Sequence, residues 1–485
     1  MTSETQCALL GIDVGTSGAR AVAVTPTGRL LAEAEEPIRQ DHRAAGGIHE
    51  QDPGEWWRVV CSVAQAMVGE LKEEHSRGAI RGVAVTSTSG TLVVADAQGR
   101  PLRPAILYDD GRGVEIAEEL NQRSTSPSVR LGPSFSLVKA AWVERHEPES
   151  WERTRYLLSP ADWLSGKLRG EFGISDFTNA LKLGYDPESA SWIESVRAAG
   201  LPADRLPVVH RPGQPIGQVS KAAADETGLP PGMPVLVGAT DGMASVIASG
   251  AGACGDANTT LGTTLVWKAL HNAKPSAHRG VYFHLHPGGL WVPGAASNTG
   301  LGSIRPAGAL LANSPAEMDR LAASYFPTPV VCYMLSGEGE RFPFADPKAA
   351  SFVDGSPRDA GESYAAQLQS IAFVERWGYE ILESCGIKVG DKVFSTGAAA
   401  KSPVLSQLRA QVLGKTIVLP RYPTAAFGAA ILAATGTIFA GHIFDAIRSM
   451  SAILETYLPL PQLVPAFDVI YRSFRDSCAR RGYNA

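Results

Sequence analysis

The N-terminal stretch of the chain alternates short apolar runs with turn residues. Residues 8–14 are apolar apart from Asp13, which stands one position before the end of the run, and Ala21–Val24 form a second apolar run. Between the two runs, Gly15 and Gly18 permit the positive φ angles of a tight reversal. The pattern predicts a buried strand, a Gly-Thr-Ser-Gly turn and a second strand.

This turn also has the chemistry of a phosphate cradle. At such a reversal, several backbone N–H groups and the hydroxyls of Thr16 and Ser17 point outward together, which suits an anionic phosphate. An ordinary N-terminal hairpin, in which Asp13 only caps the turn, fits the same residues. The pattern alone leaves both interpretations open.

Strands and helices alternate in the residues that follow. The apolar spacing predicts a helix over Ala64–Glu73 and a strand over Ile80–Ser87, which continues into the polar run Thr86–Thr91. A further strand is expected at Thr91–Asp96, and a helix is expected to start near Asp162. This alternation indicates an α/β domain, whose ligands usually bind at strand ends.

Two segments rich in proline and glycine, residues 206–217 and 229–234, mark the clearest domain boundary. A chain of 485 residues has room for two or three domains. We therefore expect one domain over residues 1–234 and a second over residues 235–485.

The second half of the chain opens like the first. Val235–Asp241 is a buried-strand pattern that ends in an acid, and residues 258–267 form a strand, turn and strand around Gly262, Thr263 and Thr264. Two such cradles, one in each half, could face each other across a cleft and hold one polyphosphate. A chance similarity is the alternative, because Gly-Thr-Thr is a common turn sequence.

Composition and charge narrow the classes of ligand. The formal net charge of −5 is spread along the chain, so no nucleic acid and no membrane surface is expected as a partner. The six cysteines are scattered without a close pair, and residues 1–7 carry no signal sequence. These features predict a cytoplasmic protein whose ligands are small neutral or phosphorylated metabolites. They give no indication of the oligomeric state.

Three patterns that suggest other sites lack the context that those sites need. Gly250–Gly255 fits G-x-G-x-x-G, but a dinucleotide site needs a strand before this pattern and a helix after it, so we expect a loop. Gly414–Thr416 resembles the end of a P-loop, but Arg409 stands where the first glycine is required. His284 and His286 lack the acid or third nitrogen that would make them convincing metal ligands.

Several motifs stand along the chain in a characteristic order. They are Gly11–Ser17, Glu50–Pro53 with Trp56 and Trp57, Ser89-Gly90, Tyr108–Arg112, Asp162–Leu164, Thr240–Gly242, Leu261–Thr264, Gly339–Pro343, Asp346-Pro347 and Gly397–Ser402. In this order they resemble the FGGY carbohydrate kinases, a branch of the actin and sugar kinase superfamily, over nearly the whole chain.

The resemblance implies a fold and an activity. The fold would be α/β, a two-domain actin-like (ribonuclease H-like) sugar kinase fold with an interdomain cleft. The activity would be ATP-dependent phosphorylation of the terminal hydroxyl of a ketopentose, D-ribulose or D-xylulose, to the 5-phosphate. Asn179–Tyr185 and parts of residues 280–298 look closest to the plant and cyanobacterial branch, whose members are thought to act on D-ribulose. A kinase for glycerol or L-ribulose, or a non-catalytic ATP-binding relative, remains the alternative.

The resemblance also implies roles for particular residues. Asp241 would be the catalytic base for the sugar hydroxyl, although a helix N-cap explains an aspartate there as well and the two roles can coexist. The sugar would lie near Thr88, Ser89, Asp110 and Asp241. Asp13 would hold Mg²⁺ through water. The residues expected to bind ATP are Thr16, Ser17, Gly262, Thr263, Thr264, Gly397, Ala398, Ala399 and Ser402.

Some neighbouring residues have simpler explanations. We expect Trp56 and Trp57 to pack in the core rather than cover the sugar, and Arg20 and Arg112 to pair with acids. The sequence also departs from the family, because alanines replace glycines after Gly397 in the adenosine loop. The added methyl groups can restrict how closely a nucleotide approaches the backbone.

Overall fold

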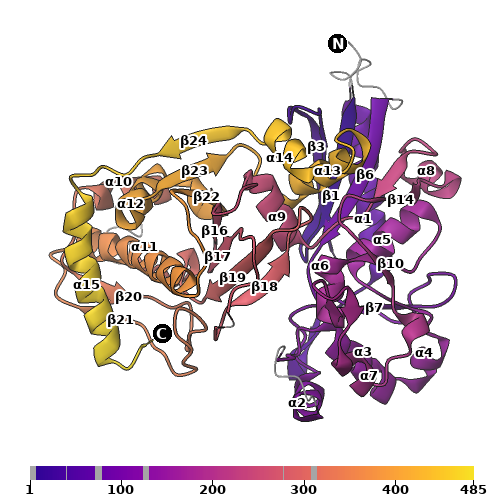
Figure 1. Ribbon diagram of the computed structural model, residues 1–485, viewed down its shortest axis with the longest axis horizontal. Coiled ribbons are helices and arrows are strands. Elements are labelled where there is room, and N and C mark those ends of the chain that lie inside the picture. Colours follow the sequence, from indigo (N-terminus) through magenta and orange to yellow (C-terminus); the bar gives the residue numbers. More distant parts are fainter. Residues whose placement is uncertain are drawn as a thin grey trace. The chain divides into compact units, whose positions relative to one another are not determined.

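The computed structural model describes residues 7–39, 41–71, 79–123, 130–276, 278–306 and 314–484. The chain folds into two compact units (Figure 1). Unit 1 consists of Met1–Ala248 and Thr424–Ser451, and unit 2 consists of Ser249–Pro423 and Ala452–Ala485. Each unit is built on one large mixed sheet.

The sheet of unit 1 has six strands in the order β14-β15-β6-β1-β2-β3. Strands β1, β2 and β3 form an antiparallel meander, β6 and β15 continue the sheet parallel to β1, and β14 is an antiparallel edge. The bounds are β1 Ala8–Val14, β2 Gly18–Val24, β3 Leu30–Pro37, β6 Ile80–Ser87, β14 Pro215–Gln218 and β15 Pro234–Leu236.

The two faces of this sheet are covered by helices from distant parts of the sequence. Leu10 and Ile12 of β1 pack in one core with residues of α1 (Pro53–Glu70) and α5 (Pro160–Arg169). On the other face α13 (Ala425–Thr437) approaches β1 so closely that a Cβ atom on Gly11 would lie 1.8 Å from the carbonyl oxygen of Ala426. Gly11 therefore has to be a glycine for α13 to cover the sheet (Figure 1).

Smaller elements surround this sheet. They are β4 His42–Ala44, η2 Ala45–Gly47, β5 Ile48–Gln51, β7 Val93–Ala95, β8 Ala105–Ile106, α2 Val114–Arg123, α3 Ser136–His146, α4 Pro148–Arg153, β9 Tyr156–Leu158, β10 Ile174–Asp176, α6 Phe177–Ala180, η5 Leu181–Leu183, β11 Tyr185–Asp186, β12 Ser191–Trp192, α7 Glu194–Ala198, η6 Ala203–Arg205, β13 Val208–His210, α8 Lys221–Thr227, α9 Asp241–Ser249 and α14 Ile443–Met450.

The sheet of unit 2 has seven strands in the order β18-β19-β17-β16-β22-β23-β24. Its bounds are β16 Ala257–Leu261, β17 Leu265–Ala269, β18 Tyr282–Leu285, β19 Trp291–Ser297, β22 Lys392–Thr396, β23 Thr416–Pro420 and β24 Ile453–Tyr457. Strands β19, β17 and β16 are antiparallel, β22 and β23 are parallel to β16, and β24 is an antiparallel edge. From β3 to β14 in unit 1 and from β19 to β24 in unit 2, the strand directions follow the same order.

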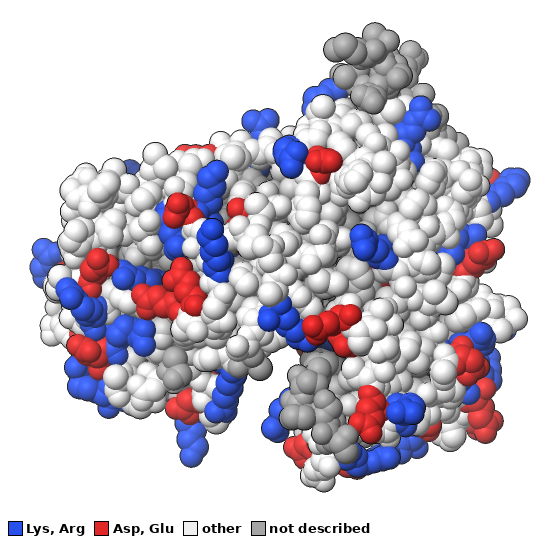
Figure 2. Space-filling view, viewed as in Figure 1, with Lys and Arg blue, Asp and Glu red and all other residues white. Residues whose placement is uncertain are grey.

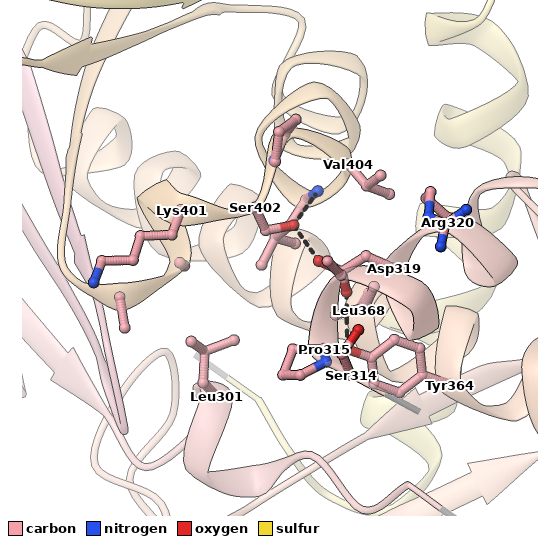
Figure 3. Close-up of a pocket in the computed structure, with 15 residues that line it drawn as sticks. Leu301, Ser314, Pro315, Asp319, Arg320, Tyr364, Leu368, Lys401, Ser402 and Val404 are labelled. Carbon is pink, nitrogen blue, oxygen red and sulfur yellow. Dashed lines mark hydrogen bonds between the residues drawn. The ribbon is translucent and has the colours of Figure 1, made fainter. Parts of the chain in front are cut away.

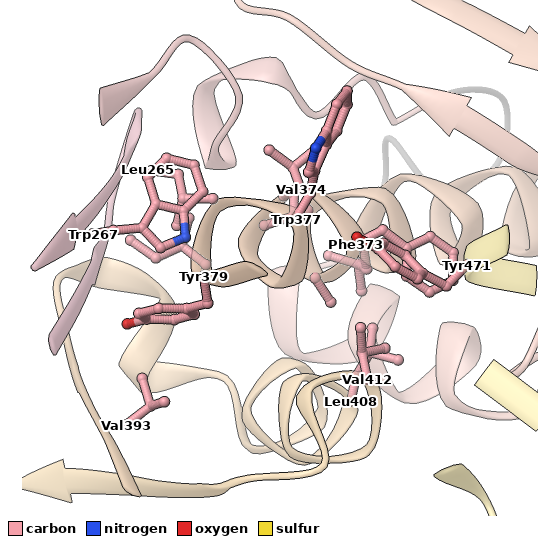
Figure 4. Packing of buried hydrophobic residues seen from close by; sticks show 14 of the residues in the cluster. Leu265, Trp267, Phe373, Val374, Trp377, Tyr379, Val393, Leu408, Val412 and Tyr471 are labelled. Atoms are coloured by element: carbon pink, nitrogen blue, oxygen red, sulfur yellow. The ribbon is translucent and has the colours of Figure 1, made fainter. Parts of the chain in front are cut away.

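The core of unit 2 is organised around the long helix α11 (Ala360–Ser384). Tyr379 of this helix points toward Trp267 and Val393 of the sheet, while Phe373 lies beside Tyr471 (Figure 4), with ring centroids 5.5 Å apart. The remaining elements of the unit are η7 Leu301–Ser303, α10 Pro315–Ala323, β20 Val331–Tyr333, β21 Phe352–Asp354, η9 Ala398–Lys401, α12 Pro403–Leu413 and α15 Val464–Arg480.

Several predictions about secondary structure are confirmed. Strand β6 has the predicted bounds, and both predicted hairpins are present as β1–β2 and β16–β17. The helix predicted over Ala64–Glu73 is the second half of α1, which already begins at Pro53 after the N-cap Asp52, and residues 72 and 73 lie outside the described residues. Trp56 and Trp57 are core residues, 2% and 7% exposed.

The compact units divide the chain differently from the expected boundary at residues 234 and 235. That point lies inside unit 1, because β15 pairs with β6 and β14. The Pro- and Gly-rich segments that suggested a boundary flank β14 and β15 at the edge of the sheet. Residues 424–451 return to unit 1, which no local pattern indicated.

Acidic and basic side chains are interspersed on the face of the molecule shown in Figure 2, so this face is neither predominantly acidic nor predominantly basic. Among the helices that the structure describes, none is both long enough and apolar enough to span a membrane.

Candidate active site

Asp13 lies near the end of β1, next to the parallel strand β6. Its partner in the register of the two strands is Thr86, whose Oγ1 donates a hydrogen bond to Asp13 Oδ1 over 3.0 Å. Ser87, the next residue of β6, forms a parallel bridge with Thr240. Three segments therefore meet at the carboxyl ends of the parallel strands in the sheet of unit 1, namely the end of β1, the end of β6 and the segment before Asp241.

Asp241 is the first residue of α9, and its Oδ1 accepts a hydrogen bond from the backbone N–H of Gly242 over 2.6 Å. The preceding residue is held as well, because the N–H of Thr240 donates to Thr178 Oγ1 over 2.9 Å. Helix α13 packs on α9, where a Cβ atom on Gly428 would lie 2.0 Å from the carbonyl oxygen of Ala244. One helix thus fixes both the strand of Asp13 and the helix of Asp241.

Asp13 has an unusually high proton affinity for an aspartate. Burial and the nearby charge of Asp241 raise the pKa of Asp13 from an ordinary 3.8 to about 7, against the opposing effects of Thr86 and Arg20. A cation beside Asp13 would favour the charged carboxylate and so oppose the effects of burial and of Asp241 on its pKa. No cluster of three or more His, Cys, Asp or Glu side chains in the described ranges could enclose a metal ion. Two neighbouring carboxylates without such a cluster fit Mg²⁺, which keeps several waters and takes few protein ligands.

The predicted sugar-binding residues Thr88 and Ser89 follow β6 directly. Thr88 Oγ1 is 3.0 Å from Thr91 Oγ1, whereas the Oγ of Ser89 is buried and has no hydrogen-bond partner in the part of the chain that the structure describes. An unpartnered buried hydroxyl is costly in a folded protein unless a ligand or water satisfies it. Lys182 lies beside it and donates from Nζ to the carbonyl oxygen of Ser89 over 3.1 Å.

Asp110, the third predicted sugar-binding residue, is 1% exposed and already has four donors. Its Oδ1 accepts from the N and Nε of Arg112 at 3.0 and 2.9 Å, and its Oδ2 accepts from Arg112 Nη2 at 2.8 Å and from the N–H of His49 at 2.7 Å. Burial alone would raise the pKa of Asp110, but these bonds lower it overall. As expected, Arg112 pairs with an acid, and so does Arg20, whose Nη2 is 2.6 Å from Glu35 Oε2.

Lys139 is a buried lysine near both Asp110 and Lys182. Its side chain is completely buried, with Nζ donating to the carbonyl oxygen of Pro133 over 2.8 Å. Burial and the charge of Lys182 lower its pKa to about 7, while Asp110 acts in the opposite direction. Lys139 therefore lies close to both Lys182 and Asp110.

The turn of the first hairpin presents its N–H groups and hides its carbonyl oxygens. Thr16 O accepts a hydrogen bond from Gln51 Nε2 over 2.8 Å, and Ser17 O accepts one from the N–H of Ile38 over 3.0 Å. Within the described parts of the chain, no acceptor takes the N–H groups of Thr16 and Ser17. This arrangement suits an anion.

The turn of the second hairpin, in unit 2, is built in the same way. The carbonyl oxygens of Gly262 and Thr263 accept hydrogen bonds from the N–H groups of Leu301 and Gly302, at 2.8 and 3.1 Å. A Cβ atom on Gly262 would meet nothing within 4 Å, so the space next to this backbone is open. The turn can therefore receive a bulky ligand at close range.

A cavity of about 610 Å³ lies in unit 2 (Figure 3), and one residue that lines it is Leu301, whose N–H donates to the carbonyl oxygen of Gly262 in this turn. Three of the predicted ATP-binding residues, Ala398, Ala399 and Ser402, line it. Gly397 precedes them with a φ of +88°, and a Cβ there would lie 2.6 Å from the carbonyl oxygen of Leu261, the residue before Gly262. The loop that contributes Ala398, Ala399 and Ser402 to the cavity therefore begins in close contact with the end of β16.

The cavity contains an acid that the sequence did not single out. Asp319 of α10 accepts hydrogen bonds from Ser402 Oγ over 2.5 Å and from Tyr364 OH over 2.9 Å, while the Lys401 side chain points away from it (Figure 3). Ser402 Oγ also caps α12 by accepting from the N–H of Leu405 over 3.0 Å. Asp319 therefore ties the loop after Gly397 to α10. No local pattern marks Asp319, Tyr364 or Lys182, because their partners are distant in sequence.

Comparison with known proteins gives a consistent result. Residues 8–248 match the N-terminal domain of the FGGY family of carbohydrate kinases, and residues 253–437 match the C-terminal domain of the same family. The chain is 27% identical to a xylulose kinase of Escherichia coli (strain K12), over 84% of this chain and 85% of that protein. It is 29% identical to a glycerol kinase of Citrifermentans bemidjiense, over 88% of this chain and 90% of that protein.

The fold leads to the same family. The crystal structure of a xylulose kinase from Rhodospirillum rubrum superimposes with a TM-score of 0.86 at 26% identity, covering 98% of each chain. The two-domain α/β fold with two mixed sheets is therefore confirmed. The chain belongs to the FGGY family of carbohydrate kinases, enzymes that transfer a phosphoryl group to an alcohol.

Proposed function

We propose that this protein uses ATP to phosphorylate the terminal hydroxyl of a ketopentose, D-ribulose or D-xylulose, giving the 5-phosphate. The observation that carries the proposal is the pair of acids in unit 1. Asp13 and Asp241 lie near each other beside the end of β6, where Thr88 and Ser89 follow. A phosphoryl transfer needs a base at the attacking hydroxyl and a second group that organises the charge of the phosphates.

Asp241 acts as the base in this proposal. Its carboxylate accepts the proton of the terminal sugar hydroxyl as the new O–P bond forms and the bond to the leaving ADP oxygen breaks. Phosphoryl transfer requires only a positioned acceptor for this proton. The hydrogen bond from Gly242 N–H orients the carboxylate at the start of α9.

Asp13 would hold Mg²⁺ through its water shell, and the ion would neutralise charge on the phosphates of ATP. Thr16 and Ser17 bind phosphate oxygens through their N–H groups and hydroxyls. Gly262, Thr263 and Thr264 do the same in unit 2, and Gly397, Ala398, Ala399 and Ser402 bind the adenosine in the cavity of unit 2.

Ser89 and Thr88 contact the sugar in this proposal, and Asp110 supports the site from behind. The buried Oγ of Ser89 has no partner among the described residues and would gain one from a sugar hydroxyl or carbonyl. Asp110 contributes by holding Arg112 and the backbone of His49 in place, since all of its strong acceptor positions are used by these residues.

The names of the relatives support a ketopentose. Relatives named xylulose kinase include the E. coli protein at 27% identity, and Asn179–Tyr185 resembles the branch thought to act on D-ribulose. A polyol such as glycerol is the second candidate, because a glycerol kinase is 29% identical over a similar length. L-Ribulose belongs in the same comparison.

The test measures ADP release from Mg-ATP with D-ribulose, D-xylulose, L-ribulose and glycerol, and identifies the product by ³¹P NMR. We expect one of the two D-ketopentoses to give the highest kcat/KM, and Asp241→Ala to lower kcat by about 10²- to 10⁴-fold. Asp225→Ala is the matched control, because Asp225 is an exposed acid of unit 1 that pairs with Lys221 at the surface. The proposal fails if no sugar stimulates ADP release above the basal rate, or if Asp241→Ala turns over normally.

A further inference from the structure

Lys182 is held in an unusual place at the end of β6. It belongs to η5, and its side chain runs across Gly90, where a Cβ atom would lie 2.6 Å from Lys182 Cδ and 3.0 Å from Nζ. Gly90 also has a φ of +89°, which favours glycine. Nζ donates to the carbonyl oxygen of Ser89 over 3.1 Å. The absence of a side chain at position 90 thus makes room for the lysine beside the residues proposed to bind the sugar.

The ammonium group of Lys182 has hydrogen-bonding capacity to spare. It carries three N–H donors, and the bond to Ser89 O is the only one that it makes within the described ranges of the chain. The Oγ of Ser89 is buried without a partner among the residues that the structure describes. Lys182 Nζ and Ser89 Oγ, which lie side by side, therefore both have hydrogen-bonding positions that a bound molecule could fill.

The charges around Lys182 also favour a ligand at this point. Burial lowers the pKa of Lys182, and the charge of Asp241 acts in the opposite direction, so the ammonium lies close enough to the proposed base to interact with it. Lys139 adds a second buried cation nearby. An oxygen that only accepts hydrogen bonds is the best ligand for a group that only donates them.

We propose that Lys182 contacts the sugar and, together with Ser89 Oγ, donates hydrogen bonds to the C2 carbonyl oxygen of the ketopentose. The inference rests on the proposed sugar kinase activity and adds a residue that determines specificity. A carbonyl oxygen has two lone pairs and no hydrogen, so it can accept from both groups at once. A secondary hydroxyl at C2 must also place its own proton, which the ammonium of Lys182 cannot accept. If Ser89 Oγ accepts that proton, its own O–H no longer has the C2 oxygen as acceptor, so the alditol gains one fewer donated hydrogen bond than the ketose. Lys182 therefore favours a ketose over the corresponding alditol.

The experiment compares kcat/KM for D-ribulose with kcat/KM for ribitol, which carries a hydroxyl at C2, and for D-xylulose with xylitol. In the wild type we expect the ketose to be preferred by roughly 10- to 100-fold, as for a hydrogen bond to a charged group. Lys182→Met keeps the length and apolar stem of the side chain, and it should reduce that preference by about tenfold or more while KM for ATP stays unchanged. Lys182→Gln, which keeps an N–H donor, should retain part of the preference.

Lys221→Met is the matched control, since it removes an exposed lysine of unit 1 that pairs with Asp225 at the surface, whereas Lys182 donates to Ser89 O. It should leave the ketose-to-alditol ratio unchanged even if it lowers stability. Thermal unfolding and nucleotide binding establish that each variant is folded. If Lys182→Met lowers kcat/KM for ketose and alditol by the same factor, or lowers neither, the contact with C2 is overturned. If the wild type phosphorylates none of these sugars, the proposed function itself fails.

Discussion

The two hairpins use one backbone design with different chemistry at one position. In unit 1 Asp13 of β1 faces Thr86 of the parallel strand β6, and in unit 2 Thr260 of β16 faces Thr396 of the parallel strand β22. Both pairs are joined by a side-chain hydrogen bond, from Thr86 Oγ1 to Asp13 Oδ1 at 3.0 Å and between the threonine hydroxyls at 2.8 Å. The backbone of both turns therefore suits phosphate, whereas a carboxylate at the position of Asp13 adds a charge in unit 1 alone.

The turns also differ in how they are supported. The first has one residue more than the second, since β1 and β2 pair at Val14 and Ala19 whereas β16 and β17 pair at Leu261 and Leu265. The carbonyl oxygens of the first turn are bound by Gln51 and Ile38, and those of the second by the residues of η7. Distinct supports therefore produce the same outward display of N–H groups.

The largest effect on activity is expected from removing the charge of Asp13, which is present in the first hairpin and has no counterpart in the second. Asp13→Asn should lower kcat/KM for Mg-ATP about a hundredfold or more, because it removes the carboxylate that we propose to hold the cation. The equivalent change in unit 2, Thr260→Val, should cost less than about tenfold, since it removes only a neutral hydrogen bond. Steady-state kinetics at varied Mg²⁺ measures both. Equal losses would mean that the hairpins do not divide the work in this way.

A second comparison separates structural from ligand-binding glycines. Gly18→Ala should destabilise the protein by about 1–3 kcal/mol, because the new Cβ would lie 2.7 Å from Glu36 O. Gly262→Ala should leave stability unchanged, since its Cβ would meet nothing within 4 Å, but should raise KM for ATP roughly tenfold. Urea unfolding and ATP kinetics test the pair. A destabilised Gly262→Ala variant with normal KM would contradict the assignment.

The acid of the first hairpin should cost stability when no cation is present. The pKa of Asp13 is about 7 in the folded protein against an ordinary 3.8, so between these values the folded chain binds a proton that the unfolded chain has lost. Stability therefore falls as pH rises through this window, and the loss is complete above pH 7. Asp13→Asn should then be more stable than the wild type at pH 8 without Mg²⁺ or nucleotide, on the order of 1 kcal/mol.

Unfolding of both proteins at pH 5 and pH 8 measures this effect. At pH 5 the difference should shrink, because Asp13 is protonated in the folded wild type. A wild type that is the more stable of the two at pH 8 in the absence of cation would show that the carboxylate is already compensated within the protein.

The smallest effect concerns the threonine partners. Thr86→Val removes the hydrogen bond that lowers the pKa of Asp13, so the fall in stability should extend to higher pH by a fraction of a unit to about one unit. Thr396→Val should leave the pH dependence as it is, since its partner Thr260 does not titrate. The pH dependence of the unfolding midpoint without Mg²⁺ measures both, and a shift of the same size in both variants would contradict the role of Thr86.

Much of this architecture was predictable from local sequence. The hairpins at residues 8–24 and 258–267 and the strand at Ile80–Ser87 carry apolar runs bounded by turn residues, which determine local structure directly. The ordered motifs were sufficient to predict the family. The roles of the individual site residues remain predictions that the variants above can test.

The rest depended on contacts between distant residues. Lys182 reaches Ser89 across more than ninety positions, and Asp319 reaches Ser402 across more than eighty, so no periodicity reveals either contact. The turns around β14 and β15 have the proline and glycine content of a linker, which favoured a boundary there, whereas the compact units divide the chain elsewhere. Strand β15 belongs to unit 1 because it pairs with β6, and the composition of a segment does not indicate which strands pair.

The close fit of α13 on β1 has a consequence for how the protein is made. Strands β1 and β6 leave the ribosome early, but the helix that covers Gly11 begins only at residue 425, after all of residues 249–423 have been synthesised. Until then one face of the first sheet has no partner and needs protection from aggregation. A nascent chain that stops before Thr424 cannot complete its first core, so the two units mature together rather than one after the other.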